Sequence, residues 1–259
     1  MLRPRIIPSL LVTRKGLYKT VRFGDPKYVG DPINAVKIFN EKEVDELAVF
    51  DIDASRHGTE PDYGLIRNLA AECRMPLCYG GGIKSLEQAV RIIKMGVEKV
   101  SLSSSAIENP ALVTGIARFI GSQSVVVVLD VRRGRAAGSY EVWTHNGTRN
   151  TQLDPRALVR QMQEAGAGEI VLNSIDQDGV MKGYDLELVR LIRPEVTVPM
   201  TILGGAGTIA DIGALYREAG IVGAAAGSLF VFKGTFRAVL INYPDQAKKA
   251  ALWREVAAG

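Results

Sequence analysis

The stretch Ser124-Val125-Val126-Val127-Val128-Leu129-Asp130 decides the fold. Four valines and a leucine in succession favour an extended backbone, because β-branched side chains are stiff and pack well on a pleated surface. A run without alternating polar residues is typical of a strand buried on both faces, as in parallel sheets. The run ends at a single carboxylate, Asp130. Such strand ends carry the chemistry in α/β folds, so Asp130 is a candidate catalytic or ligand-orienting residue, and a carboxylate that only braces the next loop is the alternative.

Strand-like and helix-like segments alternate along the rest of the chain. Asp-Pro or Asn-Pro pairs at 31–32, 109–110 and 154–155 predict helix starts, because Asp and Asn cap a helix and proline fits its first turn. Hairpin arms are expected at 17–23 and near 140–144, and a helical or frayed tail at 235–258. Strands are expected at 5–12, 46–52, 76–79, 98–102, 125–130, 169–173, 200–203 and 222–226.

Alternating strand–helix units over 259 residues predict a single closed (β/α)8 TIM barrel spanning residues 1–259, with a doubly wound open sheet as the alternative. The chain also repeats itself. Asp51 stands 29 residues before the glycine turn at Gly80, and Asp176 stands 28 residues before the turn at Gly204. This recurrence predicts two similar half-barrels, about 1–123 and 124–245, with a C-terminal tail at 246–259; a coincidence of spacing is the alternative.

Composition excludes several classes of protein. No apolar run approaches the roughly 20 residues that span a bilayer, and the N-terminus has no secretory pattern, so we expect a cytoplasmic protein without membrane contact. The net charge of +4 comes from scattered residues rather than from Lys/Arg blocks, which argues against nucleic acid as a partner. Two cysteines and two histidines without ligand spacing predict neither a disulfide framework nor a metal, and no cofactor is expected.

Two glycine turns predict a site for a phosphorylated small molecule. Glycines let backbone N–H groups approach an anion, and hydroxyls at helix starts add donors. Because the two turns occupy corresponding places in the two halves, they suggest a ligand with a phosphate at each end; turn geometry alone is the alternative. The candidate phosphate-binding residues are Gly82, Ser103, Ser104, Gly205, Gly227 and Ser228.

Two further sets of residues complete the candidate site. Asp51, Asp176 and Lys19 are expected to support it from nearby positions. Four charged residues stand at the starts of predicted strands, on the opposite face of the barrel: Arg5, Glu46, Lys99 and Glu169. Burying charges is costly, so these four form either a salt-bridge ring that closes the barrel floor or a gate at the mouth of an axial passage.

The sequence resembles the cyclase subunit of imidazole glycerol phosphate synthase, the HisF family, along nearly its whole length. The motifs that carry the resemblance are Ile6-Ile7-Pro8, Gly30-Asp31-Pro32, Asp45-Glu46-Leu47, Gly80-Gly81-Gly82-Ile83, Lys99-Val100-Ser101, Gly121-Ser122-Gln123, Gly166-Ala167-Gly168-Glu169-Ile170, Asp176-Gln177-Asp178-Gly179, Gly183-Tyr184-Asp185 and Gly204-Gly205-Ala206-Gly207.

The resemblance implies a (β/α)8 barrel that docks a HisH-like glutaminase on its N-terminal face. It implies that ammonia crosses the barrel and meets a bisphosphorylated ribulosyl substrate on the C-terminal face. The products would be imidazole glycerol phosphate and an aminoimidazole nucleotide. Within it, Arg5, Glu46, Lys99 and Glu169 match the ammonia gate, and Asp130 matches one of two catalytic aspartates.

The partner of Asp130 is missing. The first strand reads Ser9-Leu10-Leu11-Val12, where the family has Cys-Leu-Asp-Val, and the internal repeat also makes Leu11 the counterpart of Asp130. Leucine cannot transfer a proton, and losing such a group typically costs about 10²–10⁴-fold in rate. Ser103, Val180 and Leu203 also stand where the family has Asn, Thr and Ser.

With these departures, the sequence resembles a divergent branch of the family that is associated with surface-polysaccharide (lipopolysaccharide O-antigen) genes. Lys27-Tyr28-Val29-Gly30-Asp31-Pro32 and Asp53-Ala54-Ser55-Arg56 resemble it too. That branch implies ammonia delivery to an ATP-dependent amidotransferase that converts an N-acetyl group on a sugar into an acetamidino group. Two alternatives stay open: an active cyclase (a lyase) of histidine biosynthesis that uses Asp130 alone or with Asp53, and a non-enzymatic activator of a glutaminase.

Overall fold

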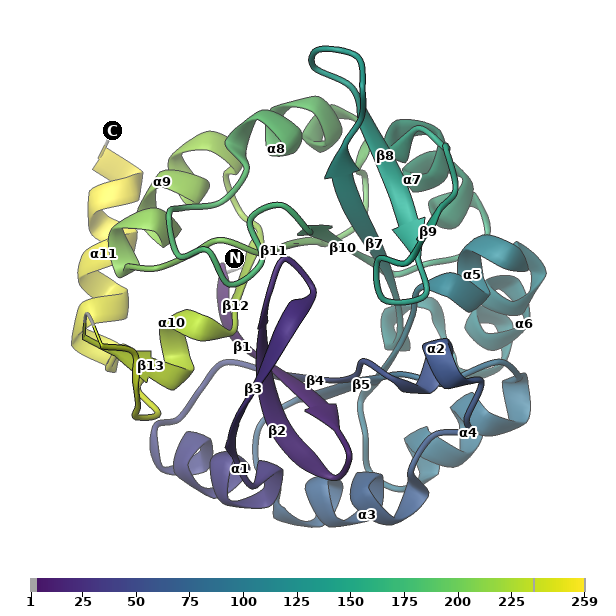
Figure 1. Cartoon of the computed structure of the whole chain (residues 1–259), viewed down its shortest axis with the longest axis horizontal. Coiled ribbons are helices and arrows are strands. Elements are labelled where there is room, and N and C mark those ends of the chain that lie inside the picture. The colour runs from purple at the N-terminus through teal and green to yellow at the C-terminus, as the bar shows by residue number, and fades with distance from the viewer. Residues whose placement is uncertain (1–3, 235, 259) are drawn as a thin grey trace.

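The computed structural model describes residues 4–234 and 236–258. Eight parallel strands close into a barrel, because each pairs with the next and β12 pairs back with β1 (Figure 1). In order around the barrel these are β1 (Arg5–Thr13), β4 (Leu47–Asp51), β5 (Leu77–Gly80), β6 (Lys99–Leu102), β7 (Val125–Arg133), β10 (Glu169–Ser174), β11 (Met200–Leu203) and β12 (Gly223–Ala226). The predicted (β/α)8 barrel is therefore confirmed, and the open sheet is excluded.

Helices surround the barrel on the outside (Figure 1). They are α1 (Pro32–Glu41), α2 (Ala54–His57), α3 (Tyr63–Glu72), α4 (Leu86–Lys94), α5 (Ser104–Glu108), α6 (Pro110–Ile120), α7 (Pro155–Glu164), α8 (Leu186–Ile192), α9 (Ile209–Ala219), α10 (Ser228–Val231) and α11 (Gln246–Ala258), with short 3₁₀ turns at Ser122–Ser124 and Arg193–Glu195. None of these helices has the length and apolar character needed to cross a membrane.

Helix caps follow the sequence in two of the three expected places. Asp31 accepts a hydrogen bond from the backbone N–H of Asn34, and Asp154 accepts one from that of Arg156. Each places proline at the first helical turn. Asn109 makes no such side-chain bond, because the preceding residues already form the short helix α5, which the sequence reasoning missed.

Strand β7 has the two buried faces that its valines predict. Val125, Val127 and Leu129 pack outward among the helices, whereas Val126 and Val128 face the barrel interior. The strand continues past Asp130 to Arg133, where a loop was expected. It is prolonged because β8 (Tyr140–Thr144) pairs with it in antiparallel register, and β8 pairs in turn with β9 (Arg149–Asn150).

A second hairpin rises between β1 and α1. Strands β2 (Gly16–Val21) and β3 (Gly24–Gly30) pair antiparallel, and their turn places Arg22 and Phe23 at positive φ. Only the first arm was predicted. The second contains Gly24, Asp25 and Pro26, which disfavour a strand, and most of it is exposed.

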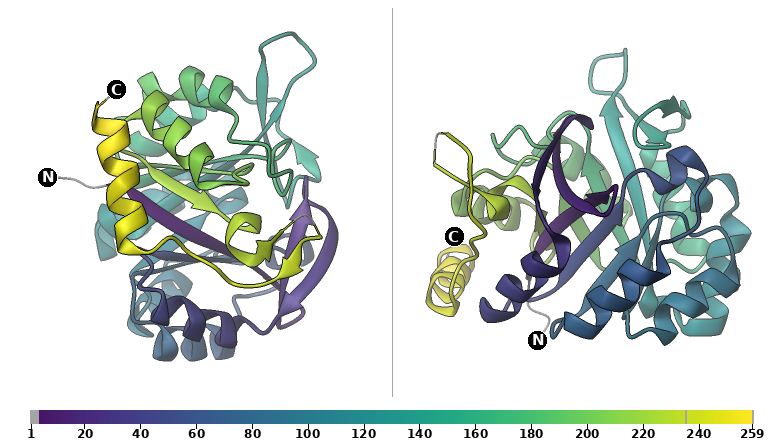
Figure 2. Two further views of the ribbon diagram at one scale, coloured as in Figure 1. Left: turned by 90° about the vertical axis from the view of Figure 1, so that its left-hand side faces the viewer. Right: turned by 60° about the horizontal axis from the view of Figure 1, so that its bottom comes forward.

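The expectation of a helical or frayed tail over 235–258 is wrong for its first part. Strands β13 (Phe232–Lys233) and β14 (Ala238–Val239) form a small hairpin, and a loop then leads to α11. The helix packs Leu252 into the core and Trp253 against Tyr216. In Figure 2 the β2–β3, β7–β8 and β13–β14 hairpins rise at one end of the barrel, opposite the end where β1 begins.

Candidate functional site

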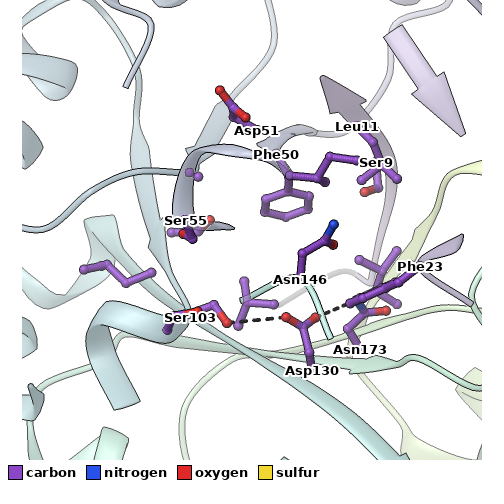
Figure 3. A pocket seen from close by; sticks show the side chains of 18 of the residues that line it. Ser9, Leu11, Phe23, Phe50, Asp51, Ser55, Ser103, Asp130, Asn146 and Asn173 are labelled. Carbon is purple, nitrogen blue, oxygen red and sulfur yellow. Dashed lines mark hydrogen bonds between the residues drawn. The ribbon is translucent and has the colours of Figure 1, made fainter. Parts of the chain in front are cut away.

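A cavity of about 120 Å³ opens at the end of the barrel where the parallel strands terminate, and seven of the eight barrel strands line it directly (Figure 3). Its lining is more apolar than polar in character. The apolar part comes from the residues Leu11, Phe23, Phe50, Val128 and Leu203. The predicted residues Asp130, Asp51, Lys19, Gly82, Ser103, Ser104 and Gly227 also line it.

Asp130 is held in place from two sides. Asn173 donates a hydrogen bond to its Oδ1 at 2.8 Å, and the hydroxyl of Ser103 donates to its Oδ2 at 3.4 Å (Figure 3). Loss of solvation raises the pKa of Asp130 to about 6, although both hydrogen bonds work in the opposite direction. A carboxyl with this pKa can accept or release a proton near neutral pH.

Leu11 lies in the same cavity, where the resemblance predicts a second carboxylate. It pairs in register with Phe50 of β4, so two apolar side chains occupy this side of the mouth. Asp53, the alternative proton-transfer group, lies elsewhere. It accepts a short hydrogen bond from Thr13 and lines a neighbouring cavity of about 330 Å³ beside α2. No second carboxylate thus faces Asp130 from the position of Leu11.

Lys19 is buried, and its ammonium donates a hydrogen bond to the carbonyl of Ser9 at 2.6 Å. Burial lowers the pKa of Lys19 to about 8, while the nearby charge of Asp178 partly opposes this shift. The ammonium lies so close to Gly227 that a Cβ there would come within 2.0 Å of it. A cation therefore faces one of the predicted phosphate-binding glycines.

The predicted phosphate-binding residues divide into two groups. Gly82 adopts φ +73°, which favours glycine, and it lines the main cavity with Ser103, Ser104 and Gly227. Gly205 and Ser228 are not part of that lining. Gly205 approaches Gly183 so closely that a Cβ would lie 2.1 Å from its carbonyl oxygen, so close packing alone accounts for this glycine.

Asp51 and Asp176, the two carboxylates predicted to support the site, both accept hydrogen bonds from the backbone of loops or strand ends. Asp51 accepts hydrogen bonds from the backbone N–H groups of Asp53 and Ala54, both at 3.1 Å, and burial raises its pKa. Asp176 accepts one from the backbone N–H of Arg133 at 2.9 Å. Both carboxylates therefore fix the backbone next to the site.

Sequence reasoning missed several residues of the cavity. Asn173 pairs in register with Asp130 and follows a buried strand, so the signal used for Asp130 could have found it. Asp178 accepts hydrogen bonds from the hydroxyl of Thr20 and the backbone N–H of Phe23, which ties the β2–β3 hairpin across the site. Phe23 and Asn146 sit at hairpin tips and reach the cavity only through the folding of those hairpins.

At the other end of the barrel the four charged residues form a ring, called here the gate ring. Arg5 contacts Glu46 and, at 2.7 Å, Glu169; Lys99 bridges the same two carboxylates at 2.8 and 2.9 Å. Thr201 adds a hydrogen bond to Glu169 at 2.6 Å. Burial would raise the pKa of Glu169, but the charges of Arg5 and Lys99 outweigh it and lower the pKa.

A layer of apolar side chains lies in the barrel interior between the gate ring and the cavity, and the hydroxyls of Ser9, Ser101 and Thr201 are buried beside it. Its side chains are small or medium in size, and none carries a charge. They are Ile7, Ala48, Cys78, Val126, Val128, Val171, Leu203 and Ala225. Among the residues that the structure describes, no group of three or more His, Cys, Asp or Glu side chains could hold a metal.

Comparison with known proteins shows the family. The model of the family described as histidine biosynthesis protein matches residues 5–237. A protein of Leptospira interrogans, provisionally named imidazole glycerol phosphate synthase subunit HisF, is 58% identical over 98% of this chain and 100% of its own length.

Two proteins of Vibrio vulnificus (strain YJ016) differ in their similarity to this chain. One, provisionally named subunit hisF3 of the synthase, is 59% identical over 96% of each chain. The other, named subunit hisF1 without qualification, is 39% identical over 89% of this chain and 91% of its own length. The chain therefore belongs to the histidine biosynthesis protein family and is a HisF-like subunit of the imidazole glycerol phosphate synthase type.

Proposed function

We propose that this chain is the synthase subunit of a glutamine amidotransferase complex and conducts ammonia without carrying out the cyclase reaction. Ammonia from a HisH-like glutaminase enters at the gate ring, crosses the barrel and leaves at the main cavity. A third protein then uses it, and we propose the ATP-dependent amidination of an N-acetyl sugar as that acceptor reaction.

One contrast carries this proposal: the gate ring is complete, whereas the cavity holds Leu11 in place of an acid. All four gate residues are joined by ion pairs, so the charged groups that the resemblance assigns to the ammonia entrance are all present and in contact. At the opposite end Leu11 and Phe50 present only carbon atoms to Asp130. General acid–base catalysis by a carboxylate pair at positions 11 and 130 is therefore not available.

The apolar interior supports transfer of neutral ammonia. Moving an ammonium ion into such surroundings is strongly unfavourable, whereas uncharged ammonia loses far less solvation. The relatives agree with a separate role, since one Vibrio strain carries both a hisF1 and a hisF3 protein and this chain is more similar to the second.

Two measurements test the proposal. The gene should not restore growth without histidine to a cyclase-deficient auxotroph, and normal growth would contradict the loss of cyclase function. Purified chain should form a complex with a HisH-like glutaminase and stimulate glutamine hydrolysis. If mixing gives neither a complex nor added hydrolysis, the conduit and the simpler activator role both fail.

An active cyclase is the second candidate, and one observation favours it. Asp130 keeps two hydrogen-bonding partners and a pKa of about 6, which suits proton transfer near neutral pH. Under this alternative Asp130 would act alone, because Asp53 faces the neighbouring cavity. Formation of imidazole glycerol phosphate from the ribulosyl substrate would support it.

A further inference from the structure

Large apolar side chains gather on the β13–β14 hairpin and face solvent. Phe236 at its tip is 96% exposed, and Val239 and Leu240 are 47% and 50% exposed. The base of the hairpin is fixed, because the backbone N–H of Leu240 donates to the carbonyl of Val231 at 2.9 Å. Single exposed apolar residues are common, but three on one anchored hairpin mark an interaction surface.

This hairpin is joined to two other segments of the same face. The guanidinium of Arg237 donates a hydrogen bond to the carbonyl of Gly179 at 3.3 Å. The ammonium of Lys27 lies 5.3 Å from the ring centre of Phe232. The backbone N–H of Arg22 donates to the carbonyl of Asp178 at 2.9 Å. The β2–β3 hairpin, the turn at 177–182 and the β13–β14 hairpin therefore form one continuous surface, called here the platform.

The platform borders the main cavity. Phe23 of the β2–β3 hairpin and Asp178 of the turn both line that cavity. Gly227, which precedes α10 and the β13–β14 hairpin, lines it as well. Figure 2 shows these hairpins on the side of the barrel opposite the end where β1 begins. A molecule seated on the platform would thus cover the outlet of the cavity.

The charges of the platform indicate the kind of occupant. Arg22, Lys27, Lys182 and Lys233 are exposed on it, and Asp25 is its one exposed acid among the described residues. Asp178 is engaged with Thr20 and Phe23 of the chain itself. An apolar centre with a cationic rim fits a protein surface that presents apolar pockets inside an acidic border.

We infer that the platform docks the protein that consumes the ammonia, through apolar contacts of Phe236 and Leu240 within an acidic rim of that partner. This inference rests on the proposed function, because only a recipient of ammonia needs to cover the outlet. Docking there would keep the released ammonia from mixing with solvent.

The test separates binding from transfer. Binding of this chain to the ATP-dependent amidotransferase of the same organism is measured by calorimetry without glutaminase. The substitutions Phe236→Ser and Leu240→Ser together should weaken binding about tenfold or more, since exposed apolar anchors at an interface carry much of its affinity. Leu153→Ser is the matched control: Leu153 is 44% exposed and lies between β9 and α7, across the barrel from β13 in Figure 1.

Transfer is measured with glutaminase, glutamine and the amidotransferase present. The double variant should lose glutamine-dependent product about tenfold or more, but keep full glutaminase stimulation and full product from added ammonium salt. Lys233→Glu should slow association, with a smaller effect at high salt. If wild-type chain binds the amidotransferase but no glutamine-dependent product forms, the proposed function fails while the docking surface stands.

Three results would overturn the docking inference. The first is unchanged binding by the double variant, and the second is no binding by wild-type chain. The third is binding of wild-type chain, but not of the double variant, to vesicles of phosphatidylglycerol, which would make the platform a membrane anchor instead.

Discussion

At the scale of single residues, Asp130 and Leu11 define what the site can do. Asp130 is an acid whose proton is held more tightly in the folded protein than in the unfolded chain. Leu11 supplies no group with which that proton could be exchanged. The same carboxyl that would serve catalysis therefore remains in the fold as a cost to stability at neutral pH.

This cost can be measured through Asp130→Asn. The folded-state pKa of about 6 lies above the ordinary value of 3.8, so wild-type stability should fall as pH rises from about 4 to about 6. Asparagine removes the charge, and the variant should be more stable than wild type by about 1–3 kcal/mol at pH 7.5 but not at pH 4. Urea unfolding at the two pH values checks this, and equal effects at both would contradict the raised pKa.

A second residue prediction concerns Leu11→Asp. The new carboxylate would face Phe50 and Leu203, and we expect it to lower the free energy of unfolding by about 1–3 kcal/mol. We expect no cyclase activity from this change alone, because Ser103, Val180 and Leu203 also depart from the family. Leu11→Asn serves as the uncharged control, and substantial imidazole glycerol phosphate formation by the single variant would refute this expectation.

The residues were predictable to different degrees. Asp130 and Asn173 end buried strands, so their direction into the barrel follows from strand periodicity. Phe23 and Asn146 could not be placed this way. They reach the cavity from hairpin tips at positive φ. The pair Asn146-Gly147 does favour such a turn, but a turn signal does not indicate over which part of the barrel the tip folds.

At the scale of elements, the β2–β3 hairpin depends on a carboxylate far away in sequence. Asp178 accepts hydrogen bonds from the hydroxyl of Thr20 at 2.7 Å and from the backbone N–H of Phe23 at 3.3 Å. Hairpins with few buried apolar contacts open at low free-energy cost, so these bonds fix the closed arrangement over the cavity.

Asp178→Ala should loosen this hairpin. Losing two hydrogen bonds leaves the hydroxyl of the buried Thr20 and the backbone N–H of Phe23 without these partners, at a cost of about 1–3 kcal/mol. Amide hydrogen exchange over residues 17–29 should therefore accelerate about tenfold or more, while that of the barrel strands stays unchanged. Asp25→Ala, at an exposed site on the same hairpin, is the control. Equal exchange in both variants would show that Asp178 does not hold the hairpin.

The gate ring gives the second prediction at this scale. Lys99→Met leaves Glu46 and Glu169, each 6% exposed at its side chain, with Arg5 as their remaining cation. The cost should be about 3–5 kcal/mol at pH 7. The pKa of Glu169 is lowered in the folded protein, so its ion pairs stabilise the fold fully above 4.5, the ordinary pKa of glutamate. This stabilisation is lost as pH falls through the lowered pKa.

The stability that Lys99→Met loses should therefore be smaller in acid. Adding Glu169→Gln to this variant should recover part of the lost stability at pH 7. Thermal unfolding of the wild type, the single variant and the double variant at pH 4 and pH 7 measures both effects. A loss independent of pH would mean that packing of the lysine side chain, rather than its charge, is what the ring requires.

At the scale of the whole molecule, alternation of strands and helices was enough to predict the barrel, because most barrel strands are marked by an apolar run, and β6 (Lys99–Leu102) was placed by its position between two helices. The additional hairpins were less visible. Strand β3 carries glycine and proline, and β13 and β14 are two residues each, below what a sequence pattern can show. The division into half-barrels near residue 123 stays a prediction.

The proposed function depends on a difference between the two ends of the barrel. The gate ring is assembled as an ionic network, and a layer of apolar side chains lies in the barrel interior. In the cavity at the far end, Leu11 takes the place of a partner for Asp130, and the other two carboxylates, Asp51 and Asp178, bond to the chain itself. A chain arranged in this way would pass ammonia on rather than incorporate it.

A steady-state assay with glutamine, a HisH-like glutaminase and the ribulosyl substrate tests this directly. Glutamine hydrolysis should rise when the chain is added, while imidazole glycerol phosphate should form at least about 10²-fold more slowly than glutamine is consumed. Formation of imidazole glycerol phosphate at the rate of glutamine hydrolysis would contradict the account and identify the chain as a working cyclase.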